Sequence, residues 1–365
     1  MEKVSIRKTI GFCGACIAFY IGAGFATMQE VMQYEASYGS EFWIVIAVAA
    51  AIYVYTNLSF ASNGHRLQLQ RGGDIYYAYC GKIVGTAFDW FSAIFCYMSF
   101  VVMCGGANST AVEQWEMPNG VGAILLAGSV ILTAIFGLKG ILNTLKVIGP
   151  VIILFIVAVA SITAISGWEN FGMGLEAVDN GKYEVTQVGN GNPFVSGASY
   201  GGFVILWFAA FLGEVGAKNR LKEINWGMSL SAIAIFGVAA ICCIALIANI
   251  DTTWNVGVPA LVLAKSIHPL VADVFSIIIY LGIYTSACPL LWTGIRKVSE
   301  DGSRLYKWLI IIFGALGCAV ACYIPYRPLL NVLYGLNGYL GFILVAFMIV
   351  NDIKIGISFF NKKRA

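Results

Sequence analysis

Glycines and an acidic residue interrupt the first long apolar stretch of this chain, where a membrane helix normally carries neither. Near its centre, the stretch 8–34 contains Gly22-Ala23-Gly24, and Glu30 follows about two helical turns later. Glycine costs about 1 kcal/mol in a helix interior, and a carboxylate inside a bilayer costs roughly 2.5–3.5 kcal/mol. Backbone groups freed by an unwound segment can face a solute or an ion. The pattern therefore predicts a broken membrane helix with a binding site at the break.

The residue types at this break indicate what it can bind. Amides of Gly22, Ala23 and Gly24, at the start of a half-helix near Phe25, suit a carboxylate. Thr27 belongs to the same predicted substrate site. Glu30 is predicted to be a coupling or gating residue: it carries a proton, holds a solute ammonium or acts as a gate. The alternative is a solvated acid that faces an aqueous vestibule.

A second polar interruption lies in the apolar stretch 196–217, which contains Phe211-Leu212-Gly213-Glu214. Paired interruptions at corresponding places in two halves of a chain are a pointer to a transport site. We predict Glu214 to be a coupling or gating residue; the alternative is an ion pair with Lys218 one helical turn on. Lys146 either extends to the membrane surface or supplies an ammonium in place of a coupling ion.

Composition places nearly the whole chain in a membrane. Hydrophobic residues make up 59% and charged residues 11% of the 365 residues, and the mean hydropathy is +0.81, whereas a soluble domain is about 25% charged. We predict an all-α integral membrane protein with one domain, 1–365. Apolar stretches of about 20 residues predict ten spans, at 8–34, 41–63, 84–112, 119–137, 141–166, 196–217, 225–249, 269–295, 305–323 and 329–351.

The basic residues predict the orientation of these spans. With the N-terminus inside, all lysines and arginines except Lys182, Lys265 and Arg327 fall on the inner side, as the positive-inside rule requires. We therefore predict a multi-pass protein of the cell membrane with both termini cytoplasmic. The net charge of +3 is spread over many loops, so no nucleic-acid partner is predicted, and the oligomeric state is left open.

The ten spans divide into two sets of five, 8–166 and 196–351, joined by an outer loop at 168–195. Because five is odd, the second set crosses the membrane in the opposite sense, which is an inverted repeat. The apolar segment 256–267 is too short to span, and we predict an outer lid helix there.

Other chemistries find little support in the sequence. The ten cysteines lie mostly in apolar helical context, so no disulfide framework is predicted, and Cys13-x-x-Cys16 is interpreted as a packing pair. His65 and His268 have no neighbouring cysteines, which disfavours a metal site of that kind. No nucleophile–base pair or phosphate loop is recognisable, so no enzyme is predicted.

The predicted arrangement has two inverted sets of five spans, and the first span of each set is interrupted. This arrangement resembles the leucine-transporter fold of the amino acid–polyamine–organocation superfamily. The segment Ile21–Glu30 further resembles the YkvI-like family of membrane proteins. That family resemblance extends over essentially the whole chain. Gly22-x-Gly24 resembles the sodium-coupled neurotransmitter-symporter branch, as do Gly140-Ile141 and the segment 146–150. The chain departs from that branch at Met28, which lies near the position of its usual basic gate residue.

The resemblance implies a sodium site and a solute cavity. Sodium would lie between carbonyls of Ala18 and Ile21 and the eighth-span residues Gly282, Thr285 and Ser286; the alternative is that both hydroxyls bond their own helix. From their positions half-way along the third and sixth spans, Tyr97, Trp207 and Phe208 are predicted to line the solute cavity. Phe211 of the sixth span and Tyr280 and Ile283 of the eighth complete the predicted lining, and ordinary helix packing is the alternative.

Together these features predict a sodium-coupled symporter of a small amino acid or related organic amine, working by alternating access. No cofactor is predicted beyond sodium as the coupling ion. Two alternatives remain open: a proton-coupled transporter of the same solutes, and a ligand-sensing membrane subunit that does not transport.

Overall fold

The chain folds as a layered bundle of helices, and no strand occurs among the residues described. The structure is a computed structural model that describes residues 4–69, 71–135, 138–300 and 302–364; for 18–19, 138–150, 207 and 356–364 the description is limited to the backbone. In chain order the elements are α1 (Ile6–Tyr20), α2 (Ala23–Ala26), α3 (Gln29–Tyr34), the 3-10 helix η1 (Ala36–Glu41), α4 (Phe42–Leu67), α5 (Asp74–Trp115), α6 (Val121–Ile135), α7 (Leu138–Ser166), α8 (Trp168–Asp179), α9 (Pro193–Lys218), α10 (Leu221–Ala248), α11 (Ile250–Thr253), α12 (Pro259–Ile267), α13 (Pro269–Arg296), α14 (Arg304–Tyr323) and α15 (Tyr326–Arg364).

Each of the ten predicted spans coincides with a helix or with a run of helices. Within the described chain, six helices are long and apolar enough to cross a membrane, or up to eight if two bent helix pairs each count as one span. The exact number of ten therefore stays a prediction, because the first span consists of short pieces and α6 has only 15 residues. Many long apolar helices in one chain make this a multi-pass membrane protein.

Of two helices outside the predicted spans, sequence analysis predicted one and missed the other. The short helix predicted at 256–267 is present as α12. The predicted outer loop 168–195 contains α8, which sequence analysis missed. In addition, α5 begins before its predicted span and is kinked at Gly81, whose φ is 70°.

Three extensive helix contacts join the two predicted repeats. The first span packs against the seventh (α1 on α10), and the sixth packs against the second (α9 on α4). The third and eighth spans, α5 and α13, pack against each other. These contacts are compatible with two interlocked sets of five spans, and the inverted repeat stays a prediction.

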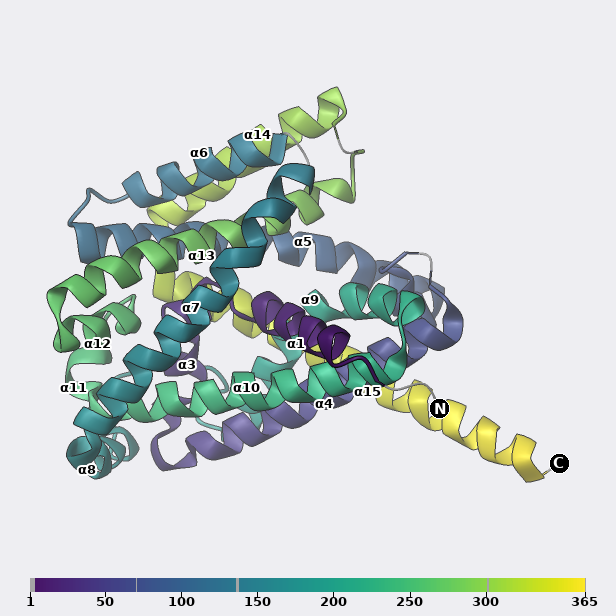
Figure 1. The fold of residues 1–365 in the computed structure, drawn as a ribbon, viewed down its shortest axis with the longest axis horizontal. Coiled ribbons are helices and arrows are strands. Elements are labelled where there is room, and N and C mark those ends of the chain that lie inside the picture. Colours follow the sequence, from purple (N-terminus) through teal and green to yellow (C-terminus); the bar gives the residue numbers. More distant parts are fainter. Residues whose placement is uncertain (1–3, 70, 136–137, 301, 365) are drawn as a thin grey trace.

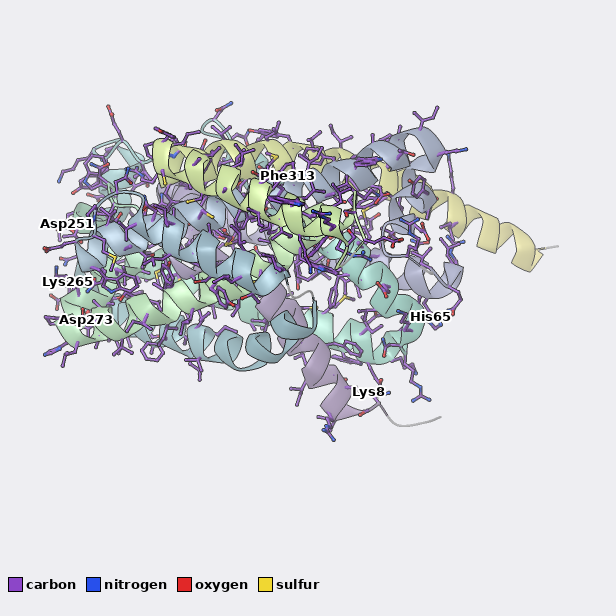
Figure 2. All side chains as sticks on the ribbon, turned by 90° about the horizontal axis from the view of Figure 1, so that it is seen from above. Lys8, His65, Asp251, Lys265, Asp273 and Phe313 are labelled. Carbon is purple, nitrogen blue, oxygen red and sulfur yellow. The ribbon has the colours of Figure 1, made fainter. Side chains whose placement is uncertain are left out.

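The molecule has two different ends (Figure 1). We call the end that carries α8, α11 and α12 the lid end; the C-terminal part of α15 projects from the opposite end. Figure 2 shows α1 projecting away from the rest of the molecule, with Lys8 near its tip. Accordingly, Ile6 and Ile10 of α1 are 75% and 62% exposed, whereas residues 22–39 are buried without exception.

Candidate solute and ion site

The predicted break in the first span is present at Ile21 and Gly22. The chain leaves α1 after Tyr20, runs extended through Gly22 (φ −98°, ψ −169°), and resumes as α2 at Ala23. Carbonyl oxygens of Tyr20 and Ile21 accept no hydrogen bond from the described residues. The amide of Ala23 points at α5, where it donates to Sδ of Met103 at 3.3 Å. The break thus leaves backbone polar groups free in the centre of the protein, as predicted.

A second break follows six residues after Gly22, and sequence analysis missed it. Met28 separates α2 from α3 in a left-handed conformation (φ 59°, ψ 12°) and is fully buried. A buried non-glycine residue in this region is strained by roughly 1–3 kcal/mol. Methionine has no preference for this conformation, so the sequence carried no signal for it.

Glu30 turns back from α3 onto the first break. A Cβ atom at Gly24 would overlap the carboxyl group of Glu30, so only glycine leaves room for it. The side chain is fully buried, and neither carboxylate oxygen has a hydrogen-bond partner among the described residues. Beside Gly24, where a solute carboxylate was predicted, the protein therefore places a carboxylate of its own.

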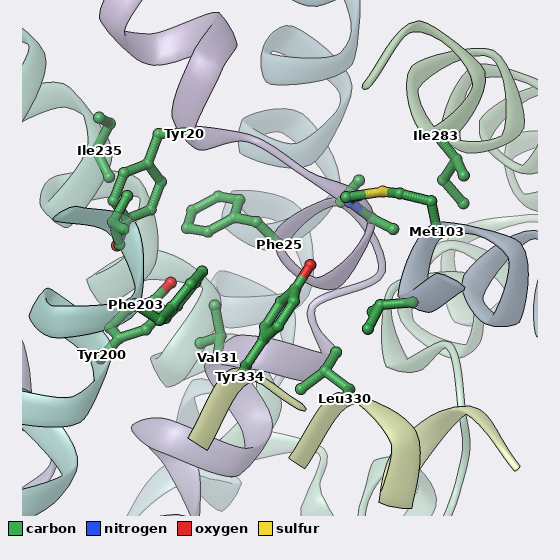
Figure 3. Close-up of a cluster of buried hydrophobic side chains, with 14 of the residues drawn as sticks. Tyr20, Phe25, Val31, Met103, Tyr200, Phe203, Ile235, Ile283, Leu330 and Tyr334 are labelled. Carbon is green, nitrogen blue, oxygen red and sulfur yellow. Dashed lines mark hydrogen bonds between the residues drawn. The ribbon is translucent and has the colours of Figure 1, made fainter. Parts of the chain in front are cut away.

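Tyrosine side chains from several helices interact electrostatically with this carboxylate, and Figure 3 shows three of them, Tyr20, Tyr200 and Tyr334, beside the broken first span. The hydroxyl of Tyr200 interacts most directly with Glu30, although not with hydrogen-bond geometry. Tyr34 stacks on Tyr200 with ring centroids 4.7 Å apart, and Tyr20 meets Tyr200 edge to face at 6.1 Å. A carboxylate enclosed by aromatic rings is well suited to an organic cation, because the rings attract positive charge over their faces.

The other predicted substrate residues divide into those near the break and those away from it. Ile283 lies across from Met103 beside the break (Figure 3), and Phe208 is buried edge to face with Tyr53. Tyr97 instead donates to the carbonyl of Phe313 on α14, and Tyr280 donates to the carbonyl of Gly122 on α6. These two hydroxyls point away from the break. Phe211 is partly buried against the core, and the side chain of Trp207 lies outside the described residues.

The sixth predicted span is bent and not unwound. The helix axis of α9 turns by 55° between Pro193–Leu206 and Phe208–Lys218. Asn337 of α15 donates to the carbonyl of Phe203 at 2.8 Å, and Tyr76 of α5 donates to that of Leu206 at 3.3 Å. Side chains from two other helices thus bond carbonyls beside the bend, which is how membrane proteins tolerate irregular helices.

The predicted sodium site stays a prediction, and its eighth-span residues make contacts of their own. Thr285 donates to the carbonyl of Gly282 at 2.8 Å, which is the helix-internal bond named as the alternative. Gly282 is pressed against Ile152 of α7. Meanwhile α1, which carries Ala18, packs on α10 and projects from the body (Figure 2). Ser286 is half-buried, and the side chain of Ala18 lies outside the description.

Of the two remaining coupling candidates, Glu214 lies outside the break: it is 46% exposed and pairs with Lys218 at 2.5 Å, which is the alternative that sequence analysis left open. The side chains of Lys146 and Ile141 lie outside the described residues.

The lid end is closed by hydrogen bonds that converge on the segment before α12. Glu113 of α5 accepts from the amides of Gly257 and Val258 at 2.8 and 3.0 Å. Arg327 of α15 donates to Asn255 at 2.6 Å. At the break itself, the amide of Ala260 donates to the carbonyl of Thr27 at 3.1 Å. The lid helix is therefore bonded directly to the broken first span.

At the opposite end of the first span, α1 packs against α10. Glu223 accepts from the amide of Ser5 at 3.0 Å, and Lys8 lies 3.9 Å from the same carboxylate. A Cβ atom on Gly227 would lie 2.7 Å from Cβ of Phe12, so this glycine allows α1 to pack closely on α10. One end of the break is thus sealed while the helix on its other side leans outward. Such asymmetry is what an alternating-access protein shows in one of its two states.

Comparison with known proteins supports the fold assignment. No protein-family model matches the chain, and no curated protein matches its sequence, so the YkvI-like resemblance stays a prediction. Among solved structures, the chain is similar to MhsT in complex with L-phenylalanine, with a TM-score of 0.66 and 16% identity over 95% of this chain and 89% of that one. It is also similar to two variants of the manganese transporter of Eremococcus coleocola, each with a TM-score of 0.57 and 12% identity over 96% of this chain and 80% of the other. The chain therefore has the leucine-transporter-type fold.

Proposed function

We propose that this protein is a secondary active transporter of a small organic solute that bears an ammonium group, an amino acid or a related amine. The observation that carries the proposal is Glu30, a buried carboxylate without a hydrogen-bond partner in the described chain, placed at the break and ringed by tyrosines. A buried charge is costly unless it is paired, and an ammonium within this aromatic ring would supply the missing partner.

The asymmetry of the first span supports movement of the solute by alternating access. In the second state, α1 would pack against α13 and the hydrogen bonds made by Glu113, Arg327 and Thr27 would break. The break in the first span would then be exposed to the other side of the membrane. The similar solved structures support a small solute as well, since one contains L-phenylalanine and the other is a manganese transporter.

We propose sodium as the coupling ion, bound by carbonyls of Ala18 and Ile21 with Gly282, Thr285 and Ser286. Oxygen donors of this kind suit a hard cation. In this proposal the site assembles only when α1 swings from α10 toward α13. Proton coupling through Glu30 is the second candidate, because the same unpartnered carboxylate can take up a proton.

Uptake into liposomes containing the purified protein tests these proposals. Amino acids and amines would be screened with and without sodium and proton gradients, for wild type, Glu30→Gln and Ser286→Ala, with Glu176→Gln on exposed α8 as the matched control. Losing a hydrogen bond to a charged group costs about 1.5–3 kcal/mol, so Glu30→Gln should weaken the affinity for the ammonium solute roughly 10- to 150-fold.

The outcomes separate the candidates. Uptake that requires sodium and is lost in Ser286→Ala supports the sodium site, whereas uptake that follows only the proton gradient contradicts it. Solute binding without uptake under either gradient would favour a ligand-sensing subunit. An unchanged affinity in Glu30→Gln would refute the assignment of Glu30.

A further inference from the structure

A second buried acid lies close to Glu30, at a position that sequence analysis assigned to an outer loop. Glu35 follows the last residue of α3 and is fully buried. Neither of its carboxylate oxygens has a hydrogen-bond partner among the described residues. The side chain is therefore enclosed within the protein as completely as Glu30, and nothing in the described chain solvates it.

Within the described chain, the titratable groups that interact with Glu35 include no lysine, arginine or histidine. It interacts with Glu30 on α3, with Tyr20 on α1, with Tyr200 on α9, and with Cys242 and Cys243 on α10. The hydroxyls of Tyr20 and Tyr200 are themselves fully buried and have no hydrogen-bond partner among the described residues. Two carboxylates thus share a low-dielectric interior without a lysine, arginine or histidine among these neighbours.

A cover separates this group from solvent at the lid end. The backbone on either side of Glu35 is bonded to the segment 187–196: the amide of Val188 donates to the carbonyl of Gln33 at 3.2 Å, and Gln187 donates to that of Ser37 at 3.0 Å. Ser196 donates to the carbonyl of Tyr34 at 2.7 Å. The charged residues of the preceding loop, Lys182 and Glu184, are exposed.

We infer that Glu35 is a proton-binding site, which holds its proton while this cover is closed and exchanges it when the lid end opens. Like charges in one buried site cannot both persist without a counter-ion. A proton, unlike a metal ion, needs no shell of converging oxygen ligands and no added volume. Glu30 can then remain available for the solute. The inference concerns proton binding itself, so it does not depend on whether the chain transports sodium or an amine.

The test is infrared difference spectroscopy on the purified full chain in lipid nanodiscs after a pH jump. A protonated buried carboxylic acid has a C=O stretching band that an ionised carboxylate lacks. We expect the wild-type spectrum to contain this band, Glu35→Gln to lose it, and the control Glu176→Gln to retain it. If Glu35→Gln does not fold, Glu35→Asp should keep the acid but shift the band.

Two results would overturn the inference. The first is a wild-type protein without a protonated-acid band in its closed form. The second is a band that persists unchanged in Glu35→Gln and Glu35→Asp but disappears in Glu30→Gln, which would assign the proton to Glu30. Because the measurement needs neither solute nor gradient, a failure of the transport proposal cannot produce either result.

Discussion

The contact between α1 and α10 allows a direct test of the two-state interpretation through the substitution Gly227→Ala. The added Cβ would lie 2.7 Å from Cβ of Phe12, 2.8 Å from the carbonyl oxygen of Thr9 and 3.1 Å from the amide nitrogen of Cys13. Non-bonded carbon atoms pack at about 3.5–4.0 Å, so α1 must move by roughly 1 Å. Two of the three atoms belong to the backbone, and a rotamer change therefore cannot relieve the overlap.

The expected magnitude follows from the cost of overpacking. Inserting a methyl group into a close contact costs about 1–3 kcal/mol. That cost applies only while α1 is docked on α10, whereas the gain in helix propensity, about 1 kcal/mol, is the same in both states. The equilibrium should thus shift away from the docked state by roughly 5- to 150-fold.

Distances between two spin labels measure this shift. The labels would replace Ile10, which is 62% exposed on α1, and Glu300, which is exposed just beyond α13. Replacing the three half-buried cysteines, Cys13, Cys80 and Cys322, leaves only buried ones. We expect Gly227→Ala to populate a second, shorter distance.

The same helix provides a matched control. A Cβ atom on Gly237 of α10 would meet nothing within 4 Å, so Gly237→Ala brings the same gain in helix propensity without a clash. Identical distance distributions for wild type, Gly227→Ala and Gly237→Ala would refute the idea that this glycine stabilises the docked position of α1.

Three further predictions concern the break and its supports. Gly24→Ala should displace the carboxyl group of Glu30 at a cost of about 1–3 kcal/mol and weaken solute affinity, measured by calorimetry, whereas Gly14→Ala, with open space around its Cβ, should not. Asn337→Leu removes the donor to the carbonyl of Phe203 and should destabilise the protein by about 1–3 kcal/mol; an unchanged melting temperature would contradict this role. Glu113→Ala leaves two lid amides without their acceptor. Because that carboxylate is exposed, the lid segment should lose only about 0.5–1.5 kcal/mol of local stability. The amides of 254–260 should then exchange hydrogen faster in Glu113→Ala than in Glu116→Ala.

The site was partly predictable because some residue types are expensive in a membrane. Gly22, Gly24 and Glu30 interrupt an apolar helix, and that cost marked the position of the break. Tyr97 and Tyr280 were assigned to the cavity from their position along a span, but helical position does not determine the direction of a side chain once helices tilt and pack. Glu35 lies beyond the apolar stretch in the sequence, and it is buried by the tertiary structure, in which α1, α9, α10 and the segment 187–196 meet around it.

The sequence by itself determined the membrane class, the helical segments and the break in the first span. Each of these features depends on the free energy of transferring nearby side chains from water into the bilayer, which is a local property of the chain. The tertiary structure decided the rest: the left-handed turn at Met28, the bend of α9 with its bonds from Asn337 and Tyr76, the docking of α1 on α10, and the burial of two carboxylates among tyrosines from different helices. These features depend on contacts between residues far apart in the chain, and local composition contains no information about which helices will meet.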